Sequence, residues 1–138
     1  MPSRRDRRFS TTLVATAAVI VGLVVVGVTA KLIADSAAQS QVDERAAEVA
    51  SVLEGASPKD FLAFNSGREV PESVAKEVAD ADDFVNVVAR ADSAVIRFQP
   101  KGWWAGFTER CVVAVVKDER TTVLTPKTAC VRIDPEDY

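Results

Sequence analysis

The sequence predicts an α+β protein in which a long membrane helix leads into a small domain with an antiparallel β-sheet. Three observations support this fold class. Residues Leu13–Ala30 contain no charge, amide or proline. The residues that follow keep a helical spacing of apolar positions as far as about Ala79. After Asp83 the chain changes to short apolar runs rich in β-branched residues, which is the pattern of strands.

The apolar run is long enough to cross a bilayer, because eighteen helical residues span about 27 Å. We therefore expect a transmembrane helix over residues 11–34, preceded by a basic tail over residues 1–10. The cations that flank it are Arg4, Arg5, Arg7, Arg8 and Lys31. Four of the five precede the run, so the positive-inside rule predicts a single pass through the cytoplasmic (inner) membrane, with the N-terminus inside and the C-terminal domain outside.

A cleaved signal peptide is the alternative interpretation of the same segment. Val28-Thr29-Ala30 supplies the small residues that a signal peptidase prefers, and cleavage near Ala30 would release a secreted protein. Secretory apolar cores span about 7–15 residues, and this run is longer. A retained membrane helix is therefore the favoured interpretation. Within that helix, Ala18 and Gly22 form a small-xxx-small pair that predicts close packing against another helix.

The membrane helix is expected to continue outward as a stalk over residues 35–55, since Gly55 is the first glycine or proline after Lys31. Val42, Ala46, Val49 and Leu53 form one apolar stripe at helical spacing. Such a stripe needs a cover, which is either the protein's own sheet or a helix of a partner. Residues 56–138 are then a small extracytoplasmic domain packed on the stalk.

Two short helices are expected next. Ser57 has the features of an N-cap, Pro58 suits the first helical position and Asn65-Ser66-Gly67 ends the helix. Pro71 opens the other helix, which extends to about Ala79. The residues expected to face the core are Phe61, Leu62 and Phe64 in the first helix and Val74 and Val78 in the second.

The last part of the chain predicts an antiparallel meander of four or five strands. The four clear strands are Phe84–Arg90, Ala94–Gln99, Arg110–Lys117 and Thr121–Thr125, and the fifth is Ala129–Ile133. Short polar connections between neighbouring strands favour hairpins. Residues Cys111–Val116 are apolar on both faces, which indicates a central strand. We expect helices to cover one face of it and an unidentified element to cover the other.

Cys111 and Cys130 are the two cysteines of the chain, and both lie in the part placed outside the membrane. Thiols oxidise in that compartment, so a Cys111–Cys130 disulfide is expected. Closing a loop of about 20 residues stabilises a fold by about 3 kcal/mol in the chain-entropy account. Two buried free thiols are the alternative. A zinc site would lack half of its ligands, because the chain has no histidine.

Charge and composition exclude several function classes. From Lys31 onward, 13 basic residues face 19 acidic ones, which gives a net charge of −6 and no attraction for nucleic acid. The absence of histidine excludes serine–histidine and cysteine–histidine catalysis. Serine–lysine catalysis is possible in principle, but we expect no S-x-x-K spacing and no glycine-rich phosphate loop. We also expect no metal and no cofactor, and we predict a non-catalytic protein. The acidic clusters 80–83 and 134–137 do not match a calcium loop.

The segment Lys101–Phe107 is the most distinctive candidate for a partner-binding site. Both tryptophans of the protein, Trp103 and Trp104, lie in it between two glycines. Adjacent residues in an extended segment face opposite ways, so we expect one indole to be exposed. Tryptophan is enriched at the centres of protein interfaces. Lys101, Trp103, Trp104 and Phe107 are thus the candidate contact residues. Alternatively, the loop closes the end of the sheet beside Phe98.

In outline, a membrane-embedded N-terminal helix followed by a stalk, a meander and a C-terminal disulfide resembles type IV pilins and pseudopilins. Proteins of that family are processed after a glycine and carry a glutamate at the fifth mature position. Here Arg8 precedes Phe9, and Leu13 stands at the glutamate position. The resemblance therefore covers architecture alone.

Three functions are compatible with these features. The first is a non-catalytic accessory subunit of a cell-envelope complex, anchored in the lipid bilayer and bound to another membrane or envelope protein. The second is a pilin-like or pseudopilin-like structural subunit that polymerises through its N-terminal helix. The third, a ligand-binding sensor domain, is disfavoured because the short cytoplasmic tail leaves little to transmit a signal.

Overall fold

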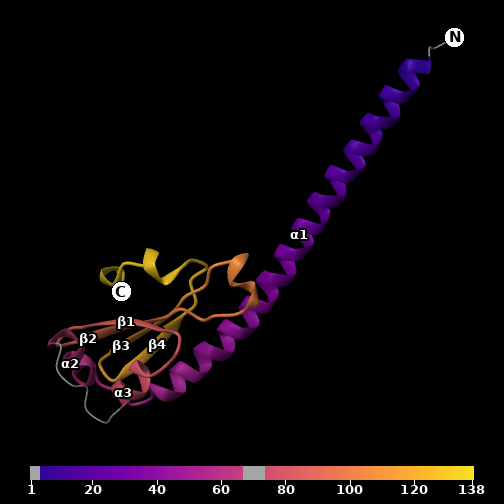
Figure 1. Cartoon of the computed structure of the whole chain (residues 1–138). Coiled ribbons are helices and arrows are strands. Elements are labelled where there is room, and N and C mark those ends of the chain that lie inside the picture. Colours follow the sequence, from indigo (N-terminus) through magenta and orange to yellow (C-terminus); the bar gives the residue numbers. More distant parts are fainter. Residues whose placement is uncertain (1–3, 67–73) are drawn as a thin grey trace.

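One helix runs through more than a third of the protein and carries a small domain on its C-terminal part. The computed structural model describes residues 4–66 and 74–138, with side chains from residue 11 onward. Helix α1 spans Arg4–Val52, 49 residues, and projects far beyond the domain (Figure 1). It begins at Arg4, inside the segment predicted as a basic tail. A helix of this length extends for about 74 Å.

The two parts of α1 have different surroundings. From Thr11 to Ile33 its side chains are exposed or, at Ala30, partly exposed, although most of them are apolar. Ala34 is the first buried residue. The buried residues that follow are Ala38, Val42, Val49 and Leu53. They recur at helical spacing and pack into one core with strands of the sheet, so the protein's own sheet covers the stripe.

Helix α1 ends in a turn that leads into the short helices. Gly55 has φ +77°, a conformation that glycine adopts without steric cost. A 3₁₀ turn over Pro58–Phe61 follows, and α2 continues it over Leu62–Ser66. Ser57 and Asp60 form a capping box at the start, as the N-cap pattern predicts. Thr121 donates a hydrogen bond to the carbonyl of Leu53 (3.0 Å) and so fixes the end of α1 to the sheet.

The faces of the short helices differ from the prediction at one position. Phe61 is buried and Phe64 packs against the core, but Leu62 is 38% exposed and does not belong to the buried face. Leu62 begins α2 directly after the 3₁₀ turn, whose three-residue period turns it away from the side of Phe61. Helix α3 spans Val74–Ala79, and Val74 and Val78 both pack into the core. Its predicted start at Pro71 lies outside the described residues.

The sheet has four antiparallel strands in the order β1-β2-β3-β4, a simple meander. The strands are β1 Phe84–Ala89, β2 Ser93–Phe98, β3 Val112–Lys117 and β4 Arg120–Leu124. Asp118 and Glu119 join β3 to β4 with positive φ at both residues, as a tight two-residue hairpin requires. Strand β3 lies in the interior of the sheet, as its continuous apolar run predicts.

The two faces of the sheet are covered by different elements. Alternate residues of β2 and β3, among them Ile96 and Ala114, face the core shared with α1, α2 and α3. On the opposite face, Val95 and Val113 pack with Cys111, Cys130 and Ile133. The C-terminal segment therefore provides the second cover, and it runs over the sheet on the side away from α1 (Figure 1).

The expected fifth strand over Ala129–Ile133 is wrong, because residues Cys130–Arg132 form a 3₁₀ turn. The disulfide explains the difference. Cys130 is bonded to Cys111, directly before β3, with a Cα–Cα distance of 5.0 Å. Both edges of β3 are already paired with β2 and β4, so a segment bonded there lies over the face of the sheet and does not extend it. Arg97 holds it there by donating hydrogen bonds to the carbonyls of Cys130 (2.9 Å) and Ile133 (2.6 Å).

An ion pair joins α1 to the start of the sheet. Arg45 donates two hydrogen bonds of 2.8 Å to the carboxylate of Asp83, and its guanidinium lies 5.2 Å from the ring centre of Phe98. These bonds to Asp83, more than the neighbouring Glu48, raise the pKa of Arg45 despite its partial burial. A raised arginine pKa stabilises the fold at all pH values below the unfolded pKa and loses its effect only at more alkaline pH. Arg45 therefore keeps its positive charge throughout the physiological pH range.

We expect Asp83→Asn to lower the free energy of unfolding by about 1–2 kcal/mol, because it weakens two charge-assisted hydrogen bonds that are only partly exposed. The measurement is urea unfolding of the full chain in detergent micelles, followed by circular dichroism. Arg90→Gln is the matched control, since the Arg90–Glu136 pair is exposed on both sides. That control should change the free energy by less than about 0.5 kcal/mol. Equal effects of the two variants would contradict the assigned role of Asp83.

Candidate functional site

The loop between β2 and β3 lies beside α1 and contains the candidate partner-binding residues. Residues Trp103–Gly106 form a 3₁₀ turn, and this turn contacts α1 (Figure 1). Trp104 is completely buried, whereas Trp103 is 59% and Phe107 54% exposed. The two adjacent indoles thus face opposite ways. Trp104 therefore closes the core, as the alternative interpretation of the loop predicts, and Trp103 remains on the surface. A partner contact at Trp103 stays a prediction.

Trp104 secures the loop to α1. Its indole N–H donates a 2.7 Å hydrogen bond to the side-chain oxygen of Gln41, and its ring belongs to the same core as Phe98. Gly102 is required for this arrangement, because a Cβ there would collide with the indole of Trp104 and lie 2.8 Å from the Gln41 oxygen. The expectation that Trp104 contacts a partner is therefore corrected to a structural role: it meets Gln41 inside the protein.

Trp103 and Phe107 form an exposed pair, which we call the aromatic pair. Their ring centres are 6.4 Å apart at an interplanar angle of 68°, an edge-to-face contact. The remaining candidate, Lys101, is exposed, and its amino group lies 3.5 Å from the carbonyl of Asp82. Together these residues present two large apolar rings on a turn whose position is fixed by a buried neighbour.

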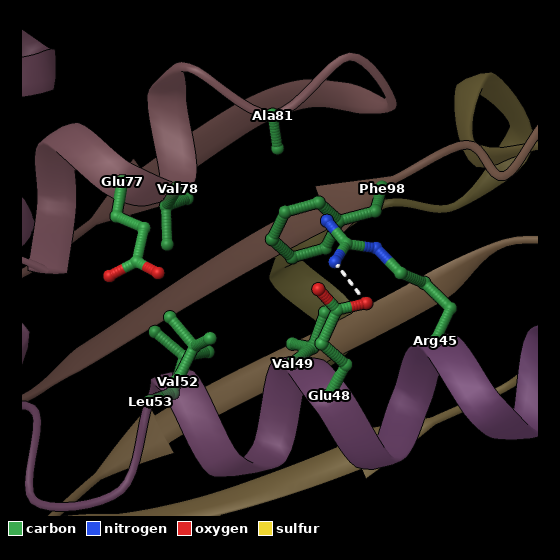
Figure 2. Close-up of a pocket in the computed structure, with 9 residues that line it drawn as sticks. All are labelled: Arg45, Glu48, Val49, Val52, Leu53, Glu77, Val78, Ala81 and Phe98. Atoms are coloured by element: carbon green, nitrogen blue, oxygen red, sulfur yellow. Dashed lines mark ion pairs between the residues drawn. The ribbon is translucent and has the colours of Figure 1, made fainter.

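A small cavity lies between α1, α3 and the sheet (Figure 2). Its volume is about 120 Å³, which is below the range of about 300–1,000 Å³ that is usual for small-molecule sites. Val49, Val78 and Phe98 form apolar walls, and Arg45 and Glu48 at its side are already joined in an ion pair of 2.8 Å. Glu77 is a third charged residue of the lining, so the small volume, and not a lack of polar groups, argues against a small-molecule site.

The described residues contain few groups suited to metal binding or catalysis. Among residues 4–66 and 74–138, no group of three or more His, Cys, Asp or Glu side chains is placed to hold a metal ion. The expectation that the chain has no S-x-x-K spacing is wrong, since Ser73 and Lys76 stand three residues apart. Ser73 lies outside the described residues. Lys76 is exposed on α3, whereas a lysine base is usually activated by desolvation.

The predicted membrane-flanking and helix-packing residues all belong to α1. Helix α1 is long and apolar enough to cross a membrane. Ala18 and Gly22 are exposed on it, and a Cβ added at Gly22 would meet no atom within 4 Å. The side chains of Arg4, Arg5, Arg7 and Arg8 lie outside the described part. Lys31 is exposed just before the domain begins to cover the helix.

Two functional features were missed by sequence reasoning. Gln41 is the partner of Trp104. It directly precedes Val42 and borders the buried stripe, but no local pattern indicates that it meets a residue 63 positions away. Arg110 is 4% exposed and forms an ion pair of 3.3 Å with Asp35 across 75 residues of sequence. A signal for Arg110 was present, since it directly precedes the apolar run of the central strand.

Comparison with protein-family models, with curated proteins and with solved structures gave no match. Function is therefore inferred from the residues and their geometry.

The two tryptophans should respond differently to substitution. We expect Trp104→Ala to lower the free energy of unfolding by about 3–5 kcal/mol, because it empties a buried site and leaves Gln41 without its donor. Trp103→Ala should change it by less than about 0.5 kcal/mol. Urea unfolding of each variant in detergent micelles measures both. If Trp103→Ala is as destabilising as Trp104→Ala, the aromatic pair is part of the core and not a free surface.

Proposed function

We propose that this protein is a non-catalytic, single-pass membrane protein whose external domain binds another membrane or envelope protein through the aromatic pair. One observation supports this proposal more than any other. Trp103 and Phe107 stay largely exposed although the neighbouring Trp104 is completely buried. Leaving two large aromatic rings in water has an energetic cost that burial against a partner would remove.

The surface of α1 supports the membrane location. Between Leu13 and Ile33 the large apolar side chains of the helix are more than half exposed. A soluble monomer rarely shows so long an apolar surface, whereas lipid tails would cover it on all sides. The arginines before it and the acidic residues after Lys31 favour a cytoplasmic N-terminus and an external domain.

The support beneath the aromatic pair suits binding. A contact residue on a rigid element loses little conformational entropy when a partner docks. Here the turn is held by the Trp104–Gln41 hydrogen bond and by the close fit at Gly102. Tryptophan and phenylalanine are also residues that concentrate binding energy at the centres of interfaces. The aromatic pair thus has both the chemistry and the fixed geometry of a hot spot.

A structural subunit that polymerises through α1 is the second candidate. The observation that favours it is the free projection of the apolar part of α1 beyond the domain, with Ala18 and Gly22 exposed (Figure 1). N-terminal sequencing of the native protein separates the two functions. A mature protein that begins at Phe9 supports the filament, and a retained arginine cluster supports the resident anchor.

Site-specific photo-crosslinking in native membranes tests the proposed interface. A photoreactive amino acid at Trp103 or Phe107 should give one covalent adduct whose partner, identified by mass spectrometry, is a membrane or envelope protein. Val131 is the matched control, because it is 84% exposed but lies on the C-terminal segment. Adducts of equal yield at Val131, or none at either aromatic position, would contradict the proposal.

The Trp103→Ala variant tests the same interface without a photoreactive group. Removing this indole should reduce co-purification of the identified partner at least tenfold, the effect expected of a hot-spot residue. Val131→Ala should leave the yield of partner unchanged. Retention of the partner by Trp103→Ala would show that the aromatic pair does not carry the interaction.

A further inference from the structure

A pocket with three cations lies where the domain meets the exposed part of α1. Its volume is about 450 Å³, and its cationic lining residues are Lys31, Arg110 and Lys127. Asp35, Gln39 and Thr108 are also among its walls. The residues come from three separate parts of the chain: α1, the segment before β3 and the segment after β4. We call this site the basic pocket.

The charge of the basic pocket is opposite to that of its surroundings. Three cations against the single carboxylate of Asp35 give it a net charge of +2, whereas residues 31–138 together carry −6. Lys31 and Lys127 are exposed, and no ion pair joins either of them to another of the described residues. Like charges gathered in this way repel one another, so a bound anion would stabilise the pocket.

Arg110 has hydrogen-bonding capacity that the protein does not fill. Its Nη2 makes one contact of 3.3 Å with the carboxylate of Asp35, whereas Arg45 makes two hydrogen bonds of 2.8 Å with Asp83. Its Nη1 donates to the hydroxyl of Thr108 at 3.2 Å and to the carbonyl of Glu109 at 3.4 Å, and its Nε is buried without a partner among the described residues. A buried guanidinium that is only partly paired is electrostatically favourable for an additional anion.

The position of the pocket on α1 indicates where such an anion would come from. Lys31 directly follows the apolar run, and Leu32 and Ile33 beside it are still 64% and 57% exposed. Asp35 is one helical turn further on, about 6 Å along the axis. If the apolar run occupies the hydrocarbon core, the pocket lies at the depth of the headgroups, which form a layer about 5–7 Å thick on each side.

We infer that the basic pocket binds the phosphate of an anionic phospholipid headgroup in the leaflet on the side of the domain. This inference rests on the membrane location in the proposed function. Arginine matches a phosphate with its planar fork, and the two exposed lysines of the lining add point charges. A zwitterionic lipid is a poorer ligand, because its choline group would approach Lys31 and Lys127 with the same sign of charge.

Lipid competition on the full chain tests the site. The protein is reconstituted in nanodiscs that contain equal amounts of phosphatidylglycerol and phosphatidylcholine, and native mass spectrometry measures the ratio of the two lipids that it retains. The wild-type protein should retain phosphatidylglycerol preferentially. Lys31→Gln and Lys127→Gln should each reduce that preference about fivefold, the factor expected for one basic residue near an anionic surface. Lys59→Gln, an exposed lysine in the 3₁₀ turn before α2, is the control and should change nothing.

Asp35→Asn is a further test variant, and its expected effect on the lipid preference has the opposite sign. Removing the carboxylate takes away the competitor of the lipid phosphate, so the preference for phosphatidylglycerol should rise. A purely structural role of Asp35 predicts no such rise. An unchanged ratio in both lysine variants would overturn the inference.

Inorganic phosphate added to nanodiscs of phosphatidylcholine alone distinguishes the source of the anion. Binding of free phosphate at the pocket, together with no preference among lipids, would overturn the headgroup assignment in favour of a soluble anion. The inference and the proposed function can fail separately. Loss of the lipid preference leaves the Trp103 crosslink unaffected, and absence of that crosslink leaves the lipid preference intact.

Discussion

The structure depends on the burial of one stripe, which runs along α1 from Ala34 and ends at Leu53 directly after the helix, against a four-stranded sheet. The apolar face of a sheet must be buried against another layer, and the stripe supplies that cover. The first residues of the stripe are alanines, Ala34 and Ala38, whose small side chains let the domain approach the helix closely. The same burial fixes where the domain begins on α1, at the residue directly after the exposed apolar part ends.

The central strand β3 imposes the second constraint, because it is apolar on both faces. Helices cover one face, and the C-terminal segment covers the other with Cys130 and Ile133. In so small a domain this second layer is too short to hold itself in place. The disulfide to Cys111 and the hydrogen bonds from Arg97 attach it to the sheet. The C-terminal segment is therefore a cover for the core and not an additional strand.

Both candidate binding features lie beside α1. Under the proposed membrane location, this part of the domain faces the membrane. The loop with the aromatic pair is attached to α1 through Trp104 and Gln41, and the basic pocket through Arg110 and Asp35. Each feature thus combines an exposed group with a buried tie to the same helix. Both ties fix the position of the domain on α1. Under the proposed membrane location, they would present the aromatic pair to a neighbouring membrane protein and the basic pocket to the headgroups.

Elements whose signals are local could be predicted from the order of residues alone. The apolar length of Leu13–Ala30, the capping residues Ser57 and Asp60 and the β-branched runs after Asp83 each depend on neighbours along the chain, and the corresponding helices and strands are present. The disulfide was also predictable, because the chain offers only one pair of cysteines.

The other features depend on how the elements pack in three dimensions. Which of two adjacent tryptophans is buried, whether residues 129–133 form a strand, and which cations converge on one pocket all depend on contacts between residues far apart in sequence. Composition and periodicity contain no information about such contacts, since burial of Trp104 is set by Gln41 and Gly102, and the conformation of Cys130 by the occupied edges of β3.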